Sequence, residues 1–307
     1  EQMNAHFPHA SRLIYGCMGL GGGWNDSPVT KDDISQARSI IDTVLDLDIN
    51  VFDHADIYGG GECESLFAEV LAEDSTLRDK LILINKAGIR REGQPFIDAP
   101  TRYDFSSDYI VRSVDSSLQR LGTDYLDVFL LHRPDYLFNA DEVAATFETL
   151  KKSGKVKHFG VSNFSPTQFN LLQSRCEMPL IINQVEINIH NIERFSDGTL
   201  DMCQQHKITP QAWCPIGGVV YPAWGNTFSA EDEQRIKVEL QLQSEKYGVE
   251  DWVVALAWLL IHPANICPIV GSTTPERIIA AKAALSLPYT REDWYRLLEA
   301  RNGVHVP

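Results

Sequence analysis

The stretch from residue 50 to residue 62 constrains the fold most strongly, because a short apolar run stops there at an acidic residue and then turns through glycines. Residues 51–52 are of types that favour extended backbone, whereas consecutive glycines continue neither a strand nor a helix. Helical spacing of apolar residues resumes at 65–71. The stretch therefore predicts a buried strand that ends at Asp53 and a strand-to-helix loop that carries Tyr58.

The same succession of apolar run and helical stripe recurs along the chain. Parallel strands are joined by crossover helices, so this alternation is typical of a parallel α/β fold. Strands are expected after Arg12, before Asp53, and at 81–85, 125–131, 156–161, 180–184, 208–213 and 266–270. Helices are expected at 31–47, 65–71, 106–121, 141–153, 165–174, 199–206, 231–247, 250–261, 275–285 and 291–302. Eight strands close a barrel, so the chain is predicted to be a single (β/α)8 TIM barrel over residues 1–307, with additional helices near the C-terminus.

Two further predicted strands run into polar residues, Lys86 and His132. Side chains at the carboxyl ends of barrel strands converge on one mouth, so we expect both to share a site with Asp53 and Tyr58. A nearby ammonium favours the phenolate, so Lys86 is expected to lower the pKa of Tyr58 from about 10, while Asp53 keeps Lys86 charged. His132 can polarise a substrate carbonyl. Together the four indicate carbonyl reduction with Tyr58 as general acid.

In this order and on these strand ends, the Asp, Tyr, Lys and His resemble the catalytic tetrad of the aldo-keto reductase family. The resemblance runs from about Leu13 to about Ala284, and its strongest motifs lie at 50–61, 86, 130–134, 160–164, 183–188 and 271–277. It implies a bacterial-type, NADPH-dependent oxidoreductase that reduces an aldehyde or ketone to an alcohol by hydride transfer.

The resemblance also implies a set of cofactor-binding residues. Those expected at the nicotinamide are Ser162, Asn163, Gln184 and Trp213. Those expected at the phosphates are Cys214, Ile216, Gly217, Gly271, Ser272, Thr273, Thr274 and Arg277. From the sequence pattern alone, Ser162 and Asn163 could equally cap a helix, and Trp213 could equally be a core residue at the top of the barrel.

Three positions in the regions expected to bind the cofactor depart from the family pattern. Cys214 replaces a usual serine, Gly271 replaces a phosphate-binding lysine of many relatives, and Ala281 replaces an adenine-contacting asparagine. Arg277 remains, and a guanidinium can meet an adenosine 2′-phosphate with two hydrogen bonds. We therefore expect NADPH to be preferred over NADH, by a smaller margin than in relatives that keep the lysine.

Aromatic residues on predicted loops near the barrel mouth suggest a substrate pocket. They are Trp24, Tyr103, Phe105, Tyr221 and Trp224. Trp24 and Trp224 are expected to line this pocket together with the catalytic Tyr58 and His132.

Composition excludes several classes of partner. A formal net charge of −15 would repel nucleic acid from most of the surface. The longest uncharged apolar stretch, 252–261, is about half the length that a membrane span needs, so a buried helix is expected. The cysteines have neither metal-site spacing nor the density of a disulfide scaffold, so free thiols and no metal are expected. Without a recognisable secretory signal, the cytoplasm is the expected location, with a small carbonyl compound as substrate.

Two other functions fit the same barrel. A cofactor-binding barrel with slow turnover would be a redox sensor or regulatory subunit, as some members of the resembled family are. Alternatively, Lys86 could form a Schiff base in an aldolase-type lyase. Asp53 beside Lys86 opposes the second function, because it keeps the amine protonated.

Overall fold

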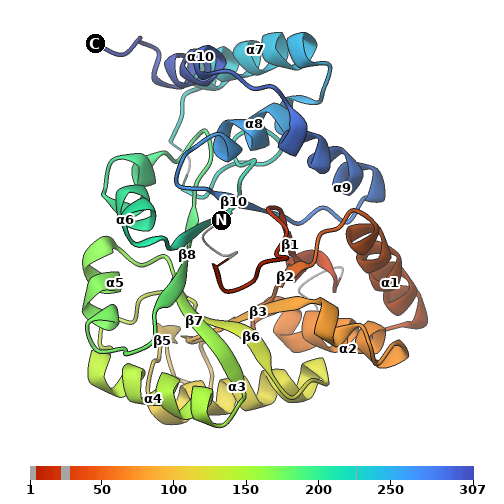
Figure 1. Ribbon diagram of the computed structural model, residues 1–307, viewed down its shortest axis with the longest axis vertical. Coiled ribbons are helices and arrows are strands. Elements are labelled where there is room, and N and C mark those ends of the chain that lie inside the picture. The colour runs from red at the N-terminus through yellow and green to blue at the C-terminus, as the bar shows by residue number, and fades with distance from the viewer. Residues whose placement is uncertain (1–4, 22–27, 226) are drawn as a thin grey trace.

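Eight parallel strands close into a barrel in the computed structural model, which describes residues 5–21, 28–225 and 227–307 (Figure 1). In order around the barrel they are β1 (Ile14–Gly16), β2 (Val51–Asp53), β3 (Ile82–Ala87), β6 (Leu126–Leu131), β7 (Val156–Ser162), β8 (Leu180–Glu186), β9 (Thr209–Trp213) and β10 (Cys267–Val270), and β10 pairs with β1. The predicted TIM-barrel fold is confirmed.

Helices cover the outer face of the barrel (Figure 1). They are α1 (Lys31–Asp46), α2 (Glu62–Glu73), α3 (Ser107–Leu121), α4 (Ala140–Lys152), α5 (Pro166–Gln173), α6 (Thr199–His206), α8 (Asp251–Leu260) and α9 (Pro275–Lys282). Two more, α7 (Ala230–Tyr247) and α10 (Arg291–Asn302), lie side by side beyond α8. These are the additional helices that the sequence predicts near the C-terminus.

Several helices start at capping boxes that the sequence encodes. In each, a serine or threonine hydroxyl accepts from a backbone amide, and the third helical residue bonds back to the cap. The pairs are Thr30 with Asp33 in α1, Ser165 with Gln168 in α5, and Ser229 with Asp232 in α7. These caps fix where the loops at the barrel mouth end.

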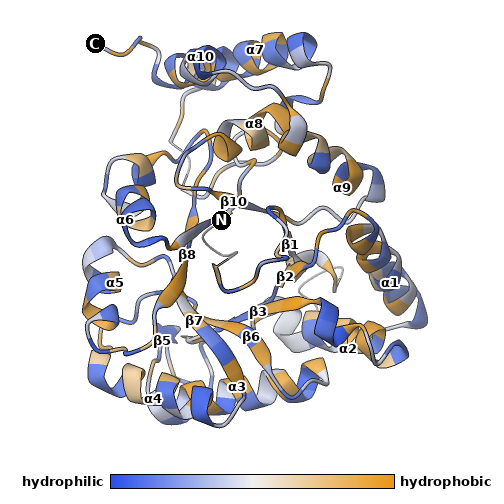
Figure 2. Ribbon diagram, in the orientation of Figure 1, coloured by the Kyte–Doolittle hydropathy of each residue, from blue (hydrophilic) through white to orange (hydrophobic). Residues whose placement is uncertain are grey.

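The two-residue period of the strands divides their side chains between the barrel interior and the helices. Ile82 and Ile84 belong to the apolar cluster inside the barrel, whereas Leu83 packs in the cluster beneath the helices. The same alternation brings Lys86 inside the barrel at the carboxyl end of β3. Figure 2 shows apolar residues along the strands and mixed, amphipathic helices around them.

The amino-terminal segment closes the opposite end of the barrel. Phe7 and Ala10 pack against the interior cluster. Asn50, just before β2, accepts from the backbone amide of Ser11 at 2.9 Å and donates to the carbonyl of His9 at 2.8 Å. The mouth at the carboxyl ends of the strands is therefore the end available for a ligand.

The apolar stretch 252–261 forms α8, which packs beside the barrel as expected. Val253 through Leu259 are buried, and Trp258 stacks on Trp294 of α10 with ring centroids 4.9 Å apart. Within the described ranges, no helix is long and apolar enough to cross a membrane.

The structure contains one hairpin that the sequence does not predict. A hairpin of β4 (Ile89–Arg90) and β5 (Arg102–Tyr103) follows β3, with Ile89 opposite Tyr103. Strands of two residues carry no measurable periodicity, so their sequence gives no signal. The hairpin adds a wall beside the barrel mouth.

Candidate active site

An ion pair between Lys86 and Asp53 lies inside the barrel mouth. The Lys86 ammonium donates to both carboxylate oxygens of Asp53, at 2.8 and 2.7 Å, and to the carbonyl of His54 at 3.0 Å. Both charged side chains are almost fully buried. Burial lowers the pKa of Lys86, and the Asp53 carboxylate opposes that change. The predicted pairing is therefore present.

Tyr58 and His132 lie around this pair. Tyr58 opens a turn of 3-10 helix at Tyr58–Gly61, and the two glycines after it have positive φ angles of 57° and 66° that L side chains rarely adopt. The Lys86 ammonium is 5.0 Å from the centroid of the Tyr58 ring. The rings of Tyr58 and His132 meet edge to face with centroids 6.3 Å apart. The fold thus brings the four sequence-predicted residues together.

The expected lowering of the Tyr58 pKa is wrong for the structure as it stands. Burial raises the pKa of the phenol well above its ordinary value, and the Asp53 carboxylate raises it further. The physical reason is that the phenol is buried away from water, which disfavours its charged form more than any neighbouring charge does. Tyr58 therefore holds its proton at neutral pH.

His132 is a buried neutral imidazole. Burial, together with the charges of Lys86 and Arg133, holds its pKa well below the ordinary value. Its Nδ1 is buried and has no hydrogen-bond partner among the described residues. A neutral imidazole has one N–H donor, which suits a hydrogen bond to an uncharged carbonyl oxygen.

A second layer of amides supports the ion pair. Gln184 donates from Nε2 to Asp53 Oδ1 at 2.9 Å and to Gln211 Oε1 at 3.0 Å. Gln211 faces the interior because it is two residues before Trp213 on β9, and sequence reasoning missed it. Gln184 thus lies at the site, and in this structure its amide nitrogen contacts Asp53.

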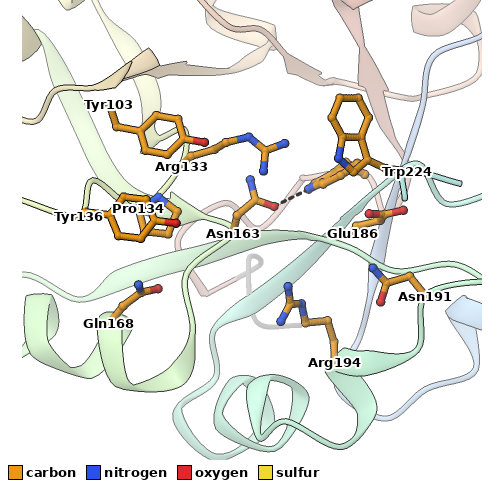
Figure 3. Close-up of a pocket in the computed structure, with 11 residues that line it drawn as sticks. Tyr103, Arg133, Pro134, Tyr136, Asn163, Gln168, Glu186, Asn191, Arg194 and Trp224 are labelled. Atoms are coloured by element: carbon orange, nitrogen blue, oxygen red, sulfur yellow. Dashed lines mark hydrogen bonds between the residues drawn. The ribbon is translucent and has the colours of Figure 1, made fainter. Parts of the chain in front are cut away.

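Ser162 and Asn163 lie beside His132 and are not caps, because Ser165 caps α5. Asn163 donates from Nδ2 to the carbonyl of His132 at 3.1 Å. Its Oδ1 accepts from Trp213 Nε1 at 2.9 Å, a bond drawn in Figure 3. Ser162 donates to the carbonyl of Gln184 at 2.7 Å. The residues predicted at the nicotinamide therefore form one connected group.

A residue of the loop after β8 holds the turn after β9. Asn188, which sequence reasoning did not single out, donates to the carbonyl of Cys214 at 3.1 Å. A Cβ on Gly217 would lie 2.7 Å from the Asn188 amide nitrogen and 3.2 Å from the Cys214 carbonyl oxygen, so this close packing favours glycine. Burial raises the pKa of Cys214 to about 11, and the thiol is therefore neutral. Ile216 is partly buried and packs against the apolar cluster beneath the helices.

The loop between β10 and α9 offers donors for an anion. Tyr15 donates to the carbonyl of Ser272 at 3.1 Å, and Ser272 Oγ accepts from the amide of Thr274 at 3.1 Å. The α9 helix begins after Thr274 without a side-chain cap. Arg277 is exposed and makes no ion pair with the described residues. Gly271 and Thr273 complete this loop, which fits a phosphate group at a helix N-terminus.

A pocket of about 290 Å³ opens beside these residues (Figure 3). Its lining includes Tyr103, Arg133, Tyr136, Glu186, Arg194 and Trp224, together with Asn163 and Trp213. Trp224 lines this pocket, whereas Trp24 lies outside the described residues. Tyr58 and His132 are not among the lining residues of this pocket.

Phe105 is buried and does not line the pocket, contrary to the expectation from the sequence. It is 2% exposed and packs between Phe138 and Phe164, with centroid distances of 6.0 and 6.3 Å. Tyr221 does not line the pocket either. Arg133 is the residue that sequence reasoning missed here. Its position directly after His132 is the signal that could have identified it.

In the described part of the chain, no three or more His, Cys, Asp or Glu side chains lie close enough to hold an ion. His54 packs edge to face on Phe67 with centroids 4.6 Å apart, and burial lowers its pKa to about 3. It is a neutral core residue.

A known protein family matches this chain over most of its length. The model of the aldo/keto reductase family matches residues 12–302. The chain belongs to the aldo/keto reductase family. It is 41% identical over 303 residues to the oxidoreductase YdhF of Escherichia coli, covering 98% of this chain and 96% of that protein. It is 36% identical over 299 residues to a 6-dehydroglucose reductase of Agrobacterium fabrum, covering 96% of each.

A solved aldo/keto reductase of Klebsiella pneumoniae, in complex with NADP and acetate, has the same fold. Its TM-score is 0.75 at 22% identity, with 94% of this chain and 90% of that chain covered. At 22% identity, this likeness shows only that the two proteins share a fold.

Proposed function

We propose that this protein reduces an aldehyde or ketone to an alcohol, with a hydride from NADPH and a proton from Tyr58. The observation that carries the proposal is the buried Lys86–Asp53 pair, whose ammonium lies 5.0 Å from the Tyr58 ring centroid beside a neutral His132. This combination provides a proton donor, a charge that can stabilise it after proton loss, and a donor for the carbonyl oxygen.

Each residue has a distinct part in the reaction. His132 donates a hydrogen bond that orients the substrate carbonyl, and Tyr58 gives its proton to the same oxygen as that oxygen becomes an alkoxide. Lys86 stabilises the negative charge left on the phenol, while Asp53, which accepts a hydrogen bond from Gln184, holds Lys86 in place. NADPH supplies the hydride when it is bound.

The residues present fit NADPH. Ser162, Asn163 and Gln184 carry amide and hydroxyl groups suited to a carboxamide, and Trp213 offers a ring face. The uncapped start of α9 and the exposed Arg277 suit an adenosine 2′-phosphate. The Klebsiella pneumoniae relative was solved in complex with NADP, which supports the same cofactor here. NADPH is accordingly preferred over NADH.

The protonation state of Tyr58 favours reduction over alcohol oxidation. Because its pKa is raised, the phenol keeps its proton through the neutral range and can donate it. Abstracting a proton from an alcohol would require the phenolate, which is scarce at that pH. Alcohol oxidation should therefore accelerate as pH rises, whereas reduction should not need alkaline conditions.

The substrate pocket favours a polar carbonyl compound. Arg133 makes no ion pair or hydrogen bond with the described residues, and its guanidinium lies 5.7 Å from the Trp213 ring. In Figure 3 it points into the pocket between Tyr103 and Asn163. A substrate with hydroxyl or carboxylate groups would satisfy these donors. The 6-dehydroglucose reductase relative is named for a hydroxylated substrate of this kind.

The contacts of Lys86 argue against Schiff-base chemistry. Its ammonium has three hydrogen-bond acceptors, which stabilise the charged form that cannot attack a carbonyl. We further propose that residues 1–307 form one catalytic domain in the cytoplasm. The family match over most of the chain and the free thiols of the cysteines support this.

Steady-state NADPH oxidation with a panel of aldehydes and ketones tests the proposal. An enzyme should turn over several polar carbonyls, with one alcohol formed for each NADPH consumed. Tight NADPH binding without turnover of any carbonyl would instead identify a sensor or regulatory subunit. Borohydride-trapped adducts on Lys86 would identify a lyase.

A further inference from the structure

A second hollow, of about 380 Å³, lies on the outer side of the loop that carries Tyr58. Asp56, Ile57 and Gly60 of that loop form one side. The other sides are formed by the segment from β4 onward and by α3, which contribute four arginines: Arg90, Arg91, Arg112 and Arg120. Such clustering of positive charge is unusual in a chain whose formal net charge is −15. We call this hollow the arginine groove.

Internal carboxylates balance only part of this charge. Arg90 pairs with Asp104 at 2.9 Å, and Arg120 pairs with Glu64 at 2.8 Å. Arg112 is exposed and donates from Nε to the carbonyl of Asp108 at 3.2 Å; it makes no ion pair with the described residues. A backbone carbonyl carries no net charge, so the charge of Arg112 remains unbalanced.

Hydrogen-bond donors remain after these contacts. A guanidinium has five N–H groups, and the Arg90 pair engages one nitrogen, Nη1. Ser113 and Ser116 add hydroxyls to the lining. At Gly60 a Cβ would meet no atom within 4 Å, so the loop leaves open space on this side. The groove is therefore rich in donors and has room for a small ligand.

Asp56 is the one acidic side chain among the described lining residues. Its Oδ1 is buried without a hydrogen-bond partner in the described chain. Burial and the nearby Glu64 raise its pKa to about 7, although Arg120 and Lys86 oppose the shift. In its protonated form the carboxyl can donate a hydrogen bond, so it need not repel an anion.

We propose that the arginine groove binds a doubly charged tetrahedral oxyanion, with Arg112 as its principal contact. Several acceptor oxygens and two negative charges match convergent guanidinium and hydroxyl donors better than a monovalent halide does. The same chemistry is offered by free phosphate or sulfate and by a phosphate monoester.

This groove is separate from the proposed cofactor phosphate sites. Those sites lie after β9 and β10, whereas the groove is built from the β2–α2 loop, the segment after β3, and α3. Arg91 in the groove donates to the carbonyl of Ile57 at 3.1 Å, directly before Tyr58. An anion bound to Arg91 would therefore be connected, through this hydrogen bond of Arg91, to the backbone of the loop that carries Tyr58.

Calorimetric titration of sulfate into protein saturated with NADP⁺ tests the proposal, because NADP⁺ occupies the cofactor sites and sulfate does not titrate near neutral pH. Titrations are made at constant ionic strength. Saturable binding near one equivalent is expected, with loss of affinity of at least about tenfold in Arg112→Ala and more in Arg112→Glu. Arg175→Ala is the matched control, since Arg175 is also exposed and is paired with Asp141 on another face.

Non-saturable heats in the wild type, or equal losses in the Arg112 and Arg175 variants, would refute the site. Circular dichroism of each variant verifies folding, and Arg112→Lys, which keeps the charge, should retain more affinity than Arg112→Ala.

A parallel titration with glycerol phosphate distinguishes a phosphate monoester from a free anion. Tighter binding than inorganic phosphate identifies a monoester site, and weaker binding identifies a free-anion site. Failure of NADP⁺ to bind would concern the proposed function and not this groove.

Discussion

The Lys86 ammonium and the Asp53 carboxylate form a two-oxygen contact, at 2.8 and 2.7 Å, inside the barrel mouth. Removing one partner of such a buried pair leaves the other charge without compensation, typically at a cost of about 3–5 kcal/mol. The pair therefore affects stability and catalysis together, and experiments must separate the two effects.

The double variant Asp53→Asn with Lys86→Met separates stability from catalysis. Lys86→Met alone should lose stability and lower kcat/KM by about two or more orders of magnitude, because the charge that stabilises the Tyr58 phenolate is removed. The double variant should recover much of the stability without recovering activity. Urea unfolding and carbonyl reduction measure the two effects. Near-normal kcat/KM in the double variant would show that the pair is structural.

Arg277→Ala tests the cofactor preference. It should weaken NADPH binding by roughly 1.5–3 kcal/mol, the value of a charge-assisted hydrogen bond, and leave NADH binding nearly unchanged. Fluorescence titration with both cofactors measures this. Equal losses for both would assign Arg277 to the fold or to the adenine and would leave the preference without an origin.

Arg133→Ala tests the polar character of the substrate pocket. The KM for succinic semialdehyde should rise by about tenfold or more, because the substrate carboxylate loses a charged hydrogen bond. Butanal, which has the same chain length without the carboxylate, is the matched control and should change little. If both aldehydes respond equally, Arg133 supports the site without selecting the substrate.

Asp56 predicts an unusual dependence of stability on pH. Its folded-state pKa is raised from 3.8 to about 7. Between these two pH values, Asp56 therefore keeps a proton in the folded protein that it releases in the unfolded chain. This contribution is fully present below about pH 3.8 and is lost as pH rises through about 7. Relative to Asp56→Asn, the wild type should lose about 2–3 kcal/mol of unfolding free energy between pH 5 and pH 8. Asp98→Asn, at an exposed position, is the control and should show no such difference.

Local sequence patterns were sufficient to predict the barrel and the tetrad. Lys86 and His132 follow buried strands, and the period of two fixes which way each strand end points. Asp53 ends a strand, and the glycines that follow Tyr58 permit a tight turn. These signals lie within a few residues of each side chain, so they can be seen before the fold is known.

Features that depend on distant neighbours were not predictable in the same way. The pKa of Tyr58 depends mainly on how deeply the fold buries the phenol, and then on the nearby Asp53 carboxylate at the end of β2. Phe105 lies outside any helix or strand, yet Phe138 and Phe164 bury it. The arginine groove joins the β2–α2 loop to α3, and no single segment reveals it.

Rapid mixing of an NADPH-loaded protein with a reducible aldehyde tests the central claim most directly, with the wild type compared with Tyr58→Phe. The account predicts that the variant binds NADPH normally and that its single-turnover rate of NADPH oxidation falls by about two or more orders of magnitude, because the aromatic ring remains and the proton donor is gone. A variant that oxidises NADPH at nearly the wild-type rate, with alcohol formed, would contradict the assignment of Tyr58 as the general acid.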